Sequence, residues 1–247
     1  MKIALIGYGK MGKAIERIAK ERKHQITAVI DPFNNDCIKE ISKENLNNAE
    51  ICIEFSTPTA FRNNMEKLAE TGIHTVTGTT GWYENKSEIF ELFNKNNCSL
   101  LWGSNFSIGM NVFYLMLEKA SAIINKAEMY DVSALEVHHK EKKDSPSGTA
   151  CVIADILVEN IERKTNVKYD ISKDKINENT IHFASLRNGW VPGSHSVMID
   201  SEFDTIELSH KARNRNGFAL GAVMAAEWFI DKKGIYRAED FFKRRFL

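Results

Sequence analysis

The sequence predicts an α/β fold in which a doubly wound parallel sheet is joined to a second α+β domain with a mixed sheet. Up to about residue 105, short apolar runs alternate with amphipathic segments of helical period, and a small polar turn follows each run. Between residues 180 and 210, apolar residues instead alternate with polar ones, which is typical of strands with one covered face. This change of pattern indicates two domains of different architecture.

Composition and charge exclude several classes of protein. Of the 247 residues, 43% are hydrophobic, and 33 basic residues balance 33 acidic ones. A net charge of zero argues against a nucleic-acid partner that is bound through bulk charge. No apolar run approaches the roughly 20 residues of a membrane span, and a strand that directly follows Met1 predicts no signal peptide. The four cysteines are scattered without a CxxC pair, so we expect a reduced, cytoplasmic protein with no membrane partner.

The first strand, helix and strand carry a nucleotide-binding motif. Residues 2–7 are typical of a buried parallel strand, and GYGKMG at 7–12 opens an amphipathic helix that extends to about residue 22. Residues 26–30 form the second strand, directly before Asp31. In a Rossmann-type domain, Gly7 allows the tight turn, Gly9 the approach of the pyrophosphate and Gly12 the close packing of the helix. Asp31 lies 19 positions beyond Gly12, near the roughly 20 expected for the acid that binds the ribose.

This motif predicts a site for NADH or NADPH. Asp31 favours ribose hydroxyls and therefore NADH, whereas Lys10 can attract the 2′-phosphate of NADPH. Pro32 stands where NADP-specific proteins often place an arginine. We therefore expect relaxed cofactor choice, with NADH used at least as well as NADPH. The predicted contacts in this motif are Gly7, Tyr8, Gly9, Lys10, Met11, Gly12 and Asp31.

Three further strands, at residues 50–55, 74–77 and 99–102, each end in a small polar turn. Helices are predicted after the first two, to about residue 71 and over 84–97. Ligands of open α/β sheets bind at the carboxyl ends of the strands. We therefore expect the turns after the last two strands to line the nicotinamide end of the cofactor, through Gly78, Thr79, Thr80, Gly103, Ser104, Asn105 and Phe106.

The rest of the chain predicts the second domain and then a return to helices. A long helix at 108–126 leads out of the first domain, a strand follows at 130–137, and another helix at 151–162. Residues 164–179 are polar and lack periodicity, which indicates an exposed loop. Three strands, at 180–187, 194–201 and 204–210, are expected to be antiparallel. Helices at 217–232 and 238–243 follow.

Residues 136–150, EVHHKEKKDSPSGTA, combine proton donors, cations and a helix start. Two histidines and three lysines lie between the predicted strand and helix. Ser147 suits the N-cap of that helix, and Gly148 and Thr149 fall in its first turn, where backbone N–H groups have no partner inside the helix. Such a helix end binds a carboxylate or a phosphate well. A solvated strand edge would explain any one of these residues alone, but the whole set indicates an anion site.

This stretch resembles the signature E-x-H-H-x-x-K-x-D-x-P-S-G-T-A of the 4-hydroxy-tetrahydrodipicolinate (dihydrodipicolinate) reductase family, and it meets every fixed position. GTTG at 78–81 and SNFSIGMN at 104–111 match other blocks of the family. The resemblance implies NAD(P)H-dependent reduction of a cyclic, unsaturated dicarboxylate to tetrahydrodipicolinate, with loss of water, in lysine and diaminopimelate synthesis. It also implies a discontinuous dinucleotide-binding domain, residues 1–106 and 215–247, and a substrate-binding and oligomerisation domain, 107–214, of a homotetramer.

The residue chemistry fits the implied reaction. Hydride addition to a conjugated imine leaves an enamine that needs a proton, and imidazole exchanges protons near neutral pH. We predict His138 as the proton donor and Lys142 as its catalytic partner, which stabilises developing negative charge. Neighbours in an extended segment point to opposite faces, so we assign His139 to a carboxylate of the substrate. Gly148 and Thr149 are expected to bind the other carboxylate.

Three alternatives are weaker. A dehydrogenase of an amino acid such as aspartate or homoserine explains the glycine-rich motif but not PSGTA beside HHxxK. A non-catalytic NAD-binding redox sensor needs a DNA-binding or partner module, and no region of the chain is spare. A metal site at His138, His139 and His195 lacks an acceptable ligand spacing, so we expect no metal.

Overall fold

The computed structural model describes residues 1–169 and 171–247, which form two compact units. Unit 1 comprises Met1–Ile108 and Arg215–Leu247, and unit 2 comprises Gly109–Asn214. Each unit has its own sheet. No helix among these residues is long and apolar enough to cross a membrane.

Unit 1 contains a parallel sheet in the order β11-β5-β4-β3-β1-β2, which confirms the predicted Rossmann-type sheet. The predicted strands all form, and β11, which pairs with β5, was not predicted because three residues are too few to show a period. The strands are β1 (Lys2–Ile6), β2 (Gln25–Ile30), β3 (Ile51–Glu54), β4 (His74–Thr77), β5 (Leu100–Trp102) and β11 (Ile235–Arg237).

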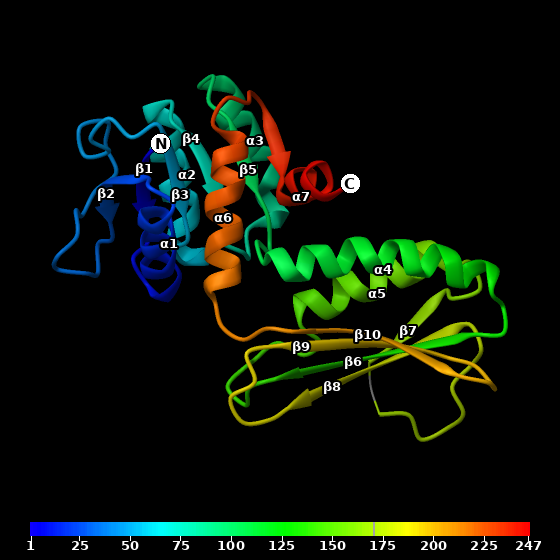
Figure 1. Cartoon of the computed structure of the whole chain (residues 1–247). Coiled ribbons are helices and arrows are strands. Elements are labelled where there is room, and N and C mark those ends of the chain that lie inside the picture. Colours follow the sequence, from blue (N-terminus) through cyan, green and yellow to red (C-terminus); the bar gives the residue numbers. More distant parts are fainter. Residues whose placement is uncertain (170) are drawn as a thin grey trace. The chain divides into compact units, whose positions relative to one another are not determined.

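Helices cover both faces of this sheet, as doubly wound topology requires (Figure 1). One apolar cluster joins the sheet to α1, α6 and α7, and the other joins it to α2 and α3. The helices are α1 (Lys10–Glu21), α2 (Pro58–Thr71), α3 (Lys86–Lys95, preceded by the 3-10 turn Tyr83–Asn85), α6 (Asn216–Phe229) and α7 (Ala238–Phe246).

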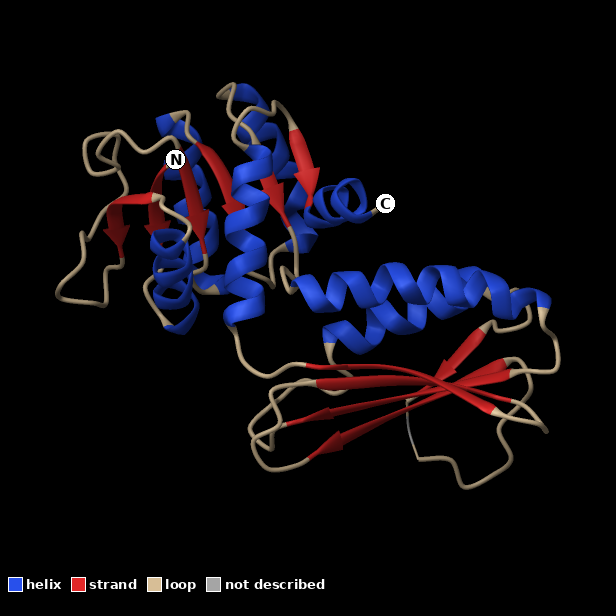
Figure 2. Cartoon of the chain, in the orientation of Figure 1, coloured by secondary structure: helices blue, strands red, loops and turns tan. Residues whose placement is uncertain are grey.

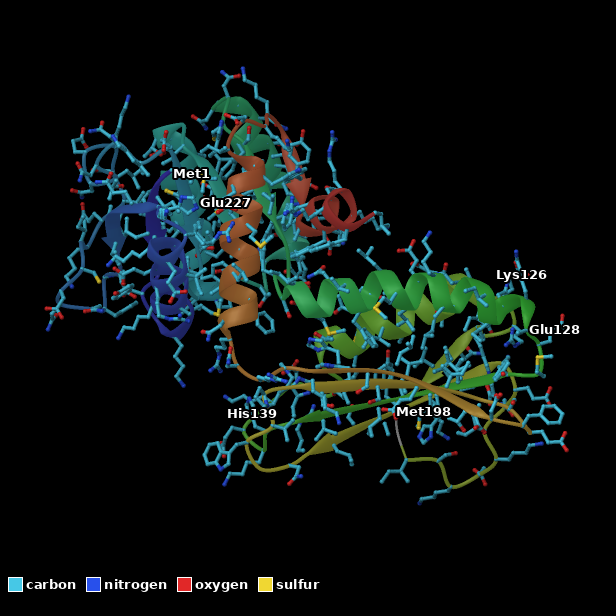
Figure 3. The ribbon with its side chains drawn as sticks, viewed as in Figure 1. Met1, Lys126, Glu128, His139, Met198 and Glu227 are labelled. Atoms are coloured by element: carbon cyan, nitrogen blue, oxygen red, sulfur yellow. The ribbon has the colours of Figure 1, made fainter. Side chains whose placement is uncertain are left out.

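Polar contacts also tie α6 to the end of α1. Glu227 of α6 accepts two hydrogen bonds from Arg22, each of 2.7 Å, and its carboxylate lies 2.7 Å from Nε2 of His24. The other ring nitrogen of His24 lies 3.3 Å from the amino group of Met1. Figure 3 labels Met1 and Glu227 in this part of unit 1. The second segment of unit 1 is therefore an integral part of the unit.

Unit 2 is a mixed sheet in the order β10-β9-β6-β8-β7, and α4 and α5 lie over one face of it (Figure 2). Buried side chains of both helices and of the central strands form a single apolar cluster. The elements are α4 (Ile108–Lys126), β6 (Asp131–His138), α5 (Gly148–Asn160), β7 (Asn166–Lys168), β8 (Thr180–Arg187), β9 (Ser194–Asp200) and β10 (Thr205–Lys211).

Two predictions for unit 2 need correction. The predicted antiparallel pairing holds for β9, which pairs antiparallel with both β10 and β6, but not for β8, which pairs in parallel with both β6 and β7. Alternation of apolar and polar residues reveals a covered face but not the direction of the neighbouring strand. The predicted exposed loop at 164–179, of which residue 170 lies outside the described residues, contains β7 and the buried Lys164. The ammonium group of Lys164 lies 2.5 Å from Asp131 and also binds the carbonyl of Glu178.

Candidate active site

The glycine-rich loop of unit 1 has the geometry that its sequence predicts. Gly7 has a φ of +88°, and a Cβ there would lie 2.4 Å from the carbonyl oxygen of Phe55. A Cβ at Gly12 would lie 2.2 Å from the carbonyl oxygen of Gly7, so the start of α1 packs directly on the loop. A Cβ at Gly9 would meet open space. α1 begins after Gly9 without a side-chain cap, which leaves its first N–H groups for a ligand.

A cavity of about 400 Å³ lies beside this loop, at the point where the strand order reverses between β1 and β3. Asp31 is held in its wall, because the carboxylate accepts hydrogen bonds from the backbone N–H of Tyr8 (2.7 Å) and of Phe33 (2.9 Å). A carboxylate, a glycine loop and an uncapped helix start together fit the ribose and pyrophosphate of a dinucleotide. Residues that line the cavity include Gly7, Gly9, Asp31, Phe55, Ser56, Asn64 and Lys39.

Lys39 is a cation of this cavity that sequence reasoning missed. Its ammonium group donates a 2.5 Å hydrogen bond to the carbonyl oxygen of Asn34 and lies 3.5 Å from that of Pro32. The residues between Asp31 and Lys39 follow neither a helical nor a strand period. The sequence therefore did not indicate that Lys39, eight positions after Asp31, lies at the cavity. Lys10, the predicted cation, is exposed at the start of α1.

The turns after β4 and β5 lie where predicted, but two of their side chains point into the protein. The hydroxyl of Thr79 binds the buried carboxylate of Glu54 at 3.0 Å, and the ring of Phe106 is in edge contact with Phe55, with centroids 5.8 Å apart. Both side chains are therefore buried in unit 1, and contact of these two residues with the cofactor stays a prediction. The other predicted contacts are two glycines, Gly78 and Gly103, and three residues with less buried side chains, Thr80, Ser104 and Asn105.

In unit 2, strand alternation places Glu136 and His138 on the buried face of β6, continuing the row of Val132 and Ala134. Glu136 is fully buried. Its Oε1 accepts hydrogen bonds from the backbone N–H of Ser147 (3.0 Å), the hydroxyl of Ser185 (2.8 Å) and the guanidinium of Arg187 (3.3 Å). A buried carboxylate thus joins β6, β8 and the start of α5.

The second oxygen of Glu136 faces two histidines. Its Oε2 lies 3.1 Å from Nδ1 of His138, within ion-pair distance but without the alignment of a hydrogen bond. Nε2 of His195 lies 3.7 Å from the same oxygen, and the two imidazole rings meet edge to face at 5.1 Å. His195 reaches this cluster because Glu136 and His195 are direct partners in the β6–β9 pair.

The surroundings of Glu136 and His195 determine their protonation states. Burial alone would raise the pKa of Glu136, but the contacts with His138, His195, Ser147 and Ser185 outweigh it and hold that pKa well below its usual range. Burial lowers the pKa of His195 and outweighs the opposing effect of Glu136. The cluster therefore contains an ionised carboxylate and a neutral His195, and His138 contacts both of them.

Lys142 and the start of α5 lie beyond this cluster. The ammonium group of Lys142 pairs with Asp144, at 2.7 and 2.9 Å from its two carboxylate oxygens. This contact was not predicted, and the catalytic role of Lys142 stays a prediction. The N-cap prediction is confirmed, since the hydroxyl of Ser147 accepts a hydrogen bond from the N–H of Ala150 at 3.1 Å. A Cβ at Gly148 would meet open space, so the first turn of α5 is accessible.

Arg187 is a further residue to which sequence reasoning gave no role. Besides Glu136, its guanidinium binds the carbonyl oxygen of Asp144 at 2.6 Å, which fixes the loop that carries Lys142. Arg187 is the partner of His138 at the ends of the parallel strands β8 and β6. Only this strand pairing indicates that Arg187 belongs to the site. His139, labelled in Figure 3, follows β6 directly.

Among the described residues, Glu136, His138 and His195 each offer a metal-ligand atom within 4.8 Å of the others. The metal site considered from sequence, His138, His139 and His195, differs from this set, because strand pairing brings Glu136 to His195. The guanidinium of Arg187 also lies 3.3 Å from Glu136 and offsets part of its charge. The absence of a metal stays a prediction.

Comparison with known proteins identifies the family. Profiles described as "Dihydrodipicolinate reductase, N-terminus" and "Dihydrodipicolinate reductase, C-terminus" match residues 1–106 and 109–242. The chain belongs to the dihydrodipicolinate reductase family. The 4-hydroxy-tetrahydrodipicolinate reductase of Christiangramia forsetii is 39% identical over 97% of both chains, and that of Thermosipho africanus is 33% identical over 100% of both. This membership confirms the predicted enzyme class, an oxidoreductase that uses NADH or NADPH, over a redox sensor or an amino-acid dehydrogenase.

Solved structures support the fold. A dipicolinate-bound dihydrodipicolinate reductase from Paenisporosarcina sp. TG-14 is similar with a TM-score of 0.76 at 20% identity, covering 97% of this chain and 98% of that one. An amine dehydrogenase from Mycobacterium smegmatis has a TM-score of 0.62 at 13% identity, covering 97% and 95%. The same architecture therefore occurs in proteins named as different enzymes, so the fold alone does not specify the reaction.

Proposed function

We propose that this enzyme reduces 4-hydroxy-tetrahydrodipicolinate to tetrahydrodipicolinate with NADH or NADPH and loss of water, a step of lysine and diaminopimelate biosynthesis. The observation that carries the proposal is the family signature at 136–150, complete in sequence and gathered around the buried Glu136 in unit 2. The relative of known structure that binds dipicolinate, a planar dicarboxylate, supports a dicarboxylate substrate.

His138 is the proton donor of this reaction. The bound cofactor supplies hydride, and the electron-rich ring that results needs a proton. Glu136 stabilises the protonated imidazole from its Nδ1 side, which leaves Nε2 to deliver the proton. A Cβ at Gly193, whose φ is +154°, would lie only 3.1 Å from Nε2 of His138. The glycine therefore leaves the space beside this nitrogen unfilled.

The two carboxylates of the substrate need separate donors. The start of α5 at Gly148 and Thr149 suits one of them, because a helix start favours an anion and a Cβ at Gly148 would meet open space. His139 binds the other, on the opposite side of the strand from His138. Lys142, oriented by Asp144, acts near the reacting end and stabilises developing negative charge.

A coupled assay tests this function. Freshly made substrate should support oxidation of NADH by the purified protein, while aspartate and homoserine should give no turnover in the reverse direction with NAD⁺. Turnover of either amino acid at a comparable rate, together with none of the cyclic dicarboxylate, would overturn the proposal.

We further propose a cytoplasmic homotetramer. All four cysteines are free, which suits a reducing compartment. The sheet face of unit 2 that faces away from α4 and α5 carries apolar side chains among polar ones, and strand register places Val137, Leu186 and Met198 on it. Met198→Asp should reduce the mass measured by light scattering, whereas Ile123→Asp, at an exposed position of α4, should not. An unchanged mass in both variants would exclude this face.

A further inference from the structure

Glu54, the last residue of β3, is a fully buried carboxylate of unit 1 that sequence reasoning did not single out. Its Oε2 accepts a 2.6 Å hydrogen bond from the hydroxyl of Thr77. Its Oε1 accepts hydrogen bonds of 3.0 Å from the hydroxyl of Thr79 and from the backbone N–H of Ser56, and another from the hydroxyl of Ser56. One side chain therefore joins the ends of β3 and β4 and the turns that follow them.

Each hydroxyl that contacts Glu54 also accepts a hydrogen bond from another group, and this second bond fixes the direction of the first. The hydroxyl of Thr77 accepts from the N–H of Thr79 at 3.3 Å, and that of Thr79 from the N–H of Ser56 at 2.9 Å. The hydroxyl of Ser56 accepts from the side-chain amide of Asn64 at 3.1 Å. A hydroxyl has one hydrogen, so all three hydroxyls can direct it to Glu54. An ionised carboxylate, which only accepts, satisfies this arrangement.

This network ends at the wall of the cofactor cavity. Ser56 and Asn64 both line the cavity. The backbone of the same turn also touches the glycine-rich loop, since a Cβ at Gly7 would lie 2.4 Å from the carbonyl oxygen of Phe55 and 2.9 Å from Cα of Ser56. A shift of the turn after β3 would therefore move one wall of the cavity and press on the loop expected to hold the pyrophosphate.

We propose that Glu54 is a positioning residue for the cofactor, whose carboxylate fixes the turns after β3 and β4 and thereby the Ser56 and Asn64 wall of the cavity. Glu54 does not reach the ligand itself, because its side chain is buried. The proposal rests on the assignment of this cavity to NADH or NADPH, and it predicts that Glu54 governs affinity for the cofactor and leaves affinity for the dicarboxylate unchanged.

Two threonines of β4 offer a matched test. Thr75 and Thr77 are both buried, but the hydroxyl of Thr75 binds the carbonyl oxygen of Ile73 at 3.3 Å, whereas that of Thr77 binds Glu54. NADH should be titrated into each protein by calorimetry without dicarboxylate, and thermal unfolding should be recorded in parallel. Thr77→Val should weaken NADH binding about tenfold, as expected for loss of a hydrogen bond to a charged group. Thr75→Val should bind NADH as the wild type does.

Changes at Glu54 itself extend the test. Glu54→Ala should weaken NADH binding more than Thr77→Val, and Glu54→Gln, which keeps one acceptor oxygen, should recover part of the loss. Lower melting temperatures with unchanged NADH affinity in the Thr77 and Glu54 variants would show that the network is only structural. If the Glu54 variants do not fold, the Thr77 and Thr75 pair decides alone. A wild type that binds NADH but does not reduce the dicarboxylate would overturn the proposed function and leave this inference standing.

Discussion

The two units each bury a glutamate near the carboxyl end of a strand, Glu54 on β3 and Glu136 on β6, and surround it differently. Both side chains are fully buried. Glu54 is bound by hydroxyls and a backbone N–H, all of them neutral groups. Glu136 is bound by the guanidinium of Arg187 and approached by two imidazoles as well as by Ser147 and Ser185. The comparison isolates the effect of the partners from that of burial.

The pKa values of the two glutamates move in opposite directions. At Glu54 burial is the largest influence, and it raises the pKa although the hydrogen bonds act against it. At Glu136 the contacts outweigh burial and lower the pKa. Neutral donors thus hold Glu54 in an ordered wall of unit 1, whereas the contacts of Glu136 with His138, His195, Ser147 and Ser185 favour a charged carboxylate in unit 2. Changes in unit 2 should affect turnover, and changes in unit 1 should affect cofactor affinity.

The largest effect is expected at His138. His138→Ala removes the proton donor and should lower kcat by about 10²–10⁴-fold, the range for a positioned acid. Affinity for NADH should not change, because the cofactor cavity belongs to unit 1. His139→Ala, at the adjacent position, should mainly raise KM for the dicarboxylate. Steady-state kinetics separate the two, and a near-normal kcat in the His138 variant would remove it from this role.

Glu136→Gln should produce the next largest effect, on stability. It leaves the partly buried guanidinium of Arg187 without its carboxylate, and the cost should not exceed the roughly 3–5 kcal/mol of a fully buried pair. The folded-state pKa of Glu136 lies below the ordinary value of 4.5, so its contribution is complete above about pH 4.5 and is lost as the pH falls through the folded value. Urea unfolding should therefore show a large difference from wild type at pH 7 that shrinks in acid. A difference independent of pH would contradict the assigned charge.

A smaller effect is expected at the start of α5. Thr149→Val keeps the shape of the side chain but removes its hydroxyl, and should raise KM for the dicarboxylate by up to about tenfold. Lys142→Ala should instead lower kcat, since developing charge loses its partner. Pyridine-2,6-dicarboxylate, an unreactive planar mimic, should compete with substrate and bind the Thr149 variant more weakly. Competition of the mimic with NADH would remove the start of α5 from the substrate site.

The smallest effect concerns cofactor choice. Asp31 opposes a 2′-phosphate, and Lys10 and Lys39 offset that repulsion, so kcat/KM with NADH should equal or exceed that with NADPH. Lys39→Gln should lower kcat/KM for NADPH a few-fold while sparing NADH, and Lys43→Gln, at an exposed lysine nearby, should change neither. A preference for NADPH of roughly a hundredfold, about 2.8 kcal/mol, would show that Asp31 has little influence.

The parts of the molecule that local sequence determines could be predicted. The loop at Gly7 and Gly12, the N-cap at Ser147 and the parallel sheet of unit 1 depend on neighbouring residues and on a repeated period. The cluster around Glu136 could not, because it depends on which strands are neighbours. His195 and Arg187 enter it through the β6–β9 and β6–β8 pairs, and no period in the sequence specifies those pairs.

Lys164 and Glu54 illustrate a second limit. A charged residue in a polar stretch suggests exposure, but Lys164 is buried because Asp131 and the carbonyl of Glu178 compensate it. Glu54 follows three apolar residues of β3, and only the positions of Thr77 and Thr79 on the next strand explain how it is accommodated. Burial of a polar side chain is decided by partners distant in sequence.

Because α6, β11 and α7 complete unit 1, the two units differ in how much of the chain each needs in order to fold. Unit 2 is continuous in sequence, so its sheet and helices can form without residues 215–247. The first five strands of unit 1 require α6, whose alanines and Phe229 cover the sheet and whose Glu227 binds Arg22. The half of the cofactor unit that is made first can therefore mature only when the last segment is present. A chain truncated after residue 214 should resist limited proteolysis in unit 2 and remain sensitive in unit 1.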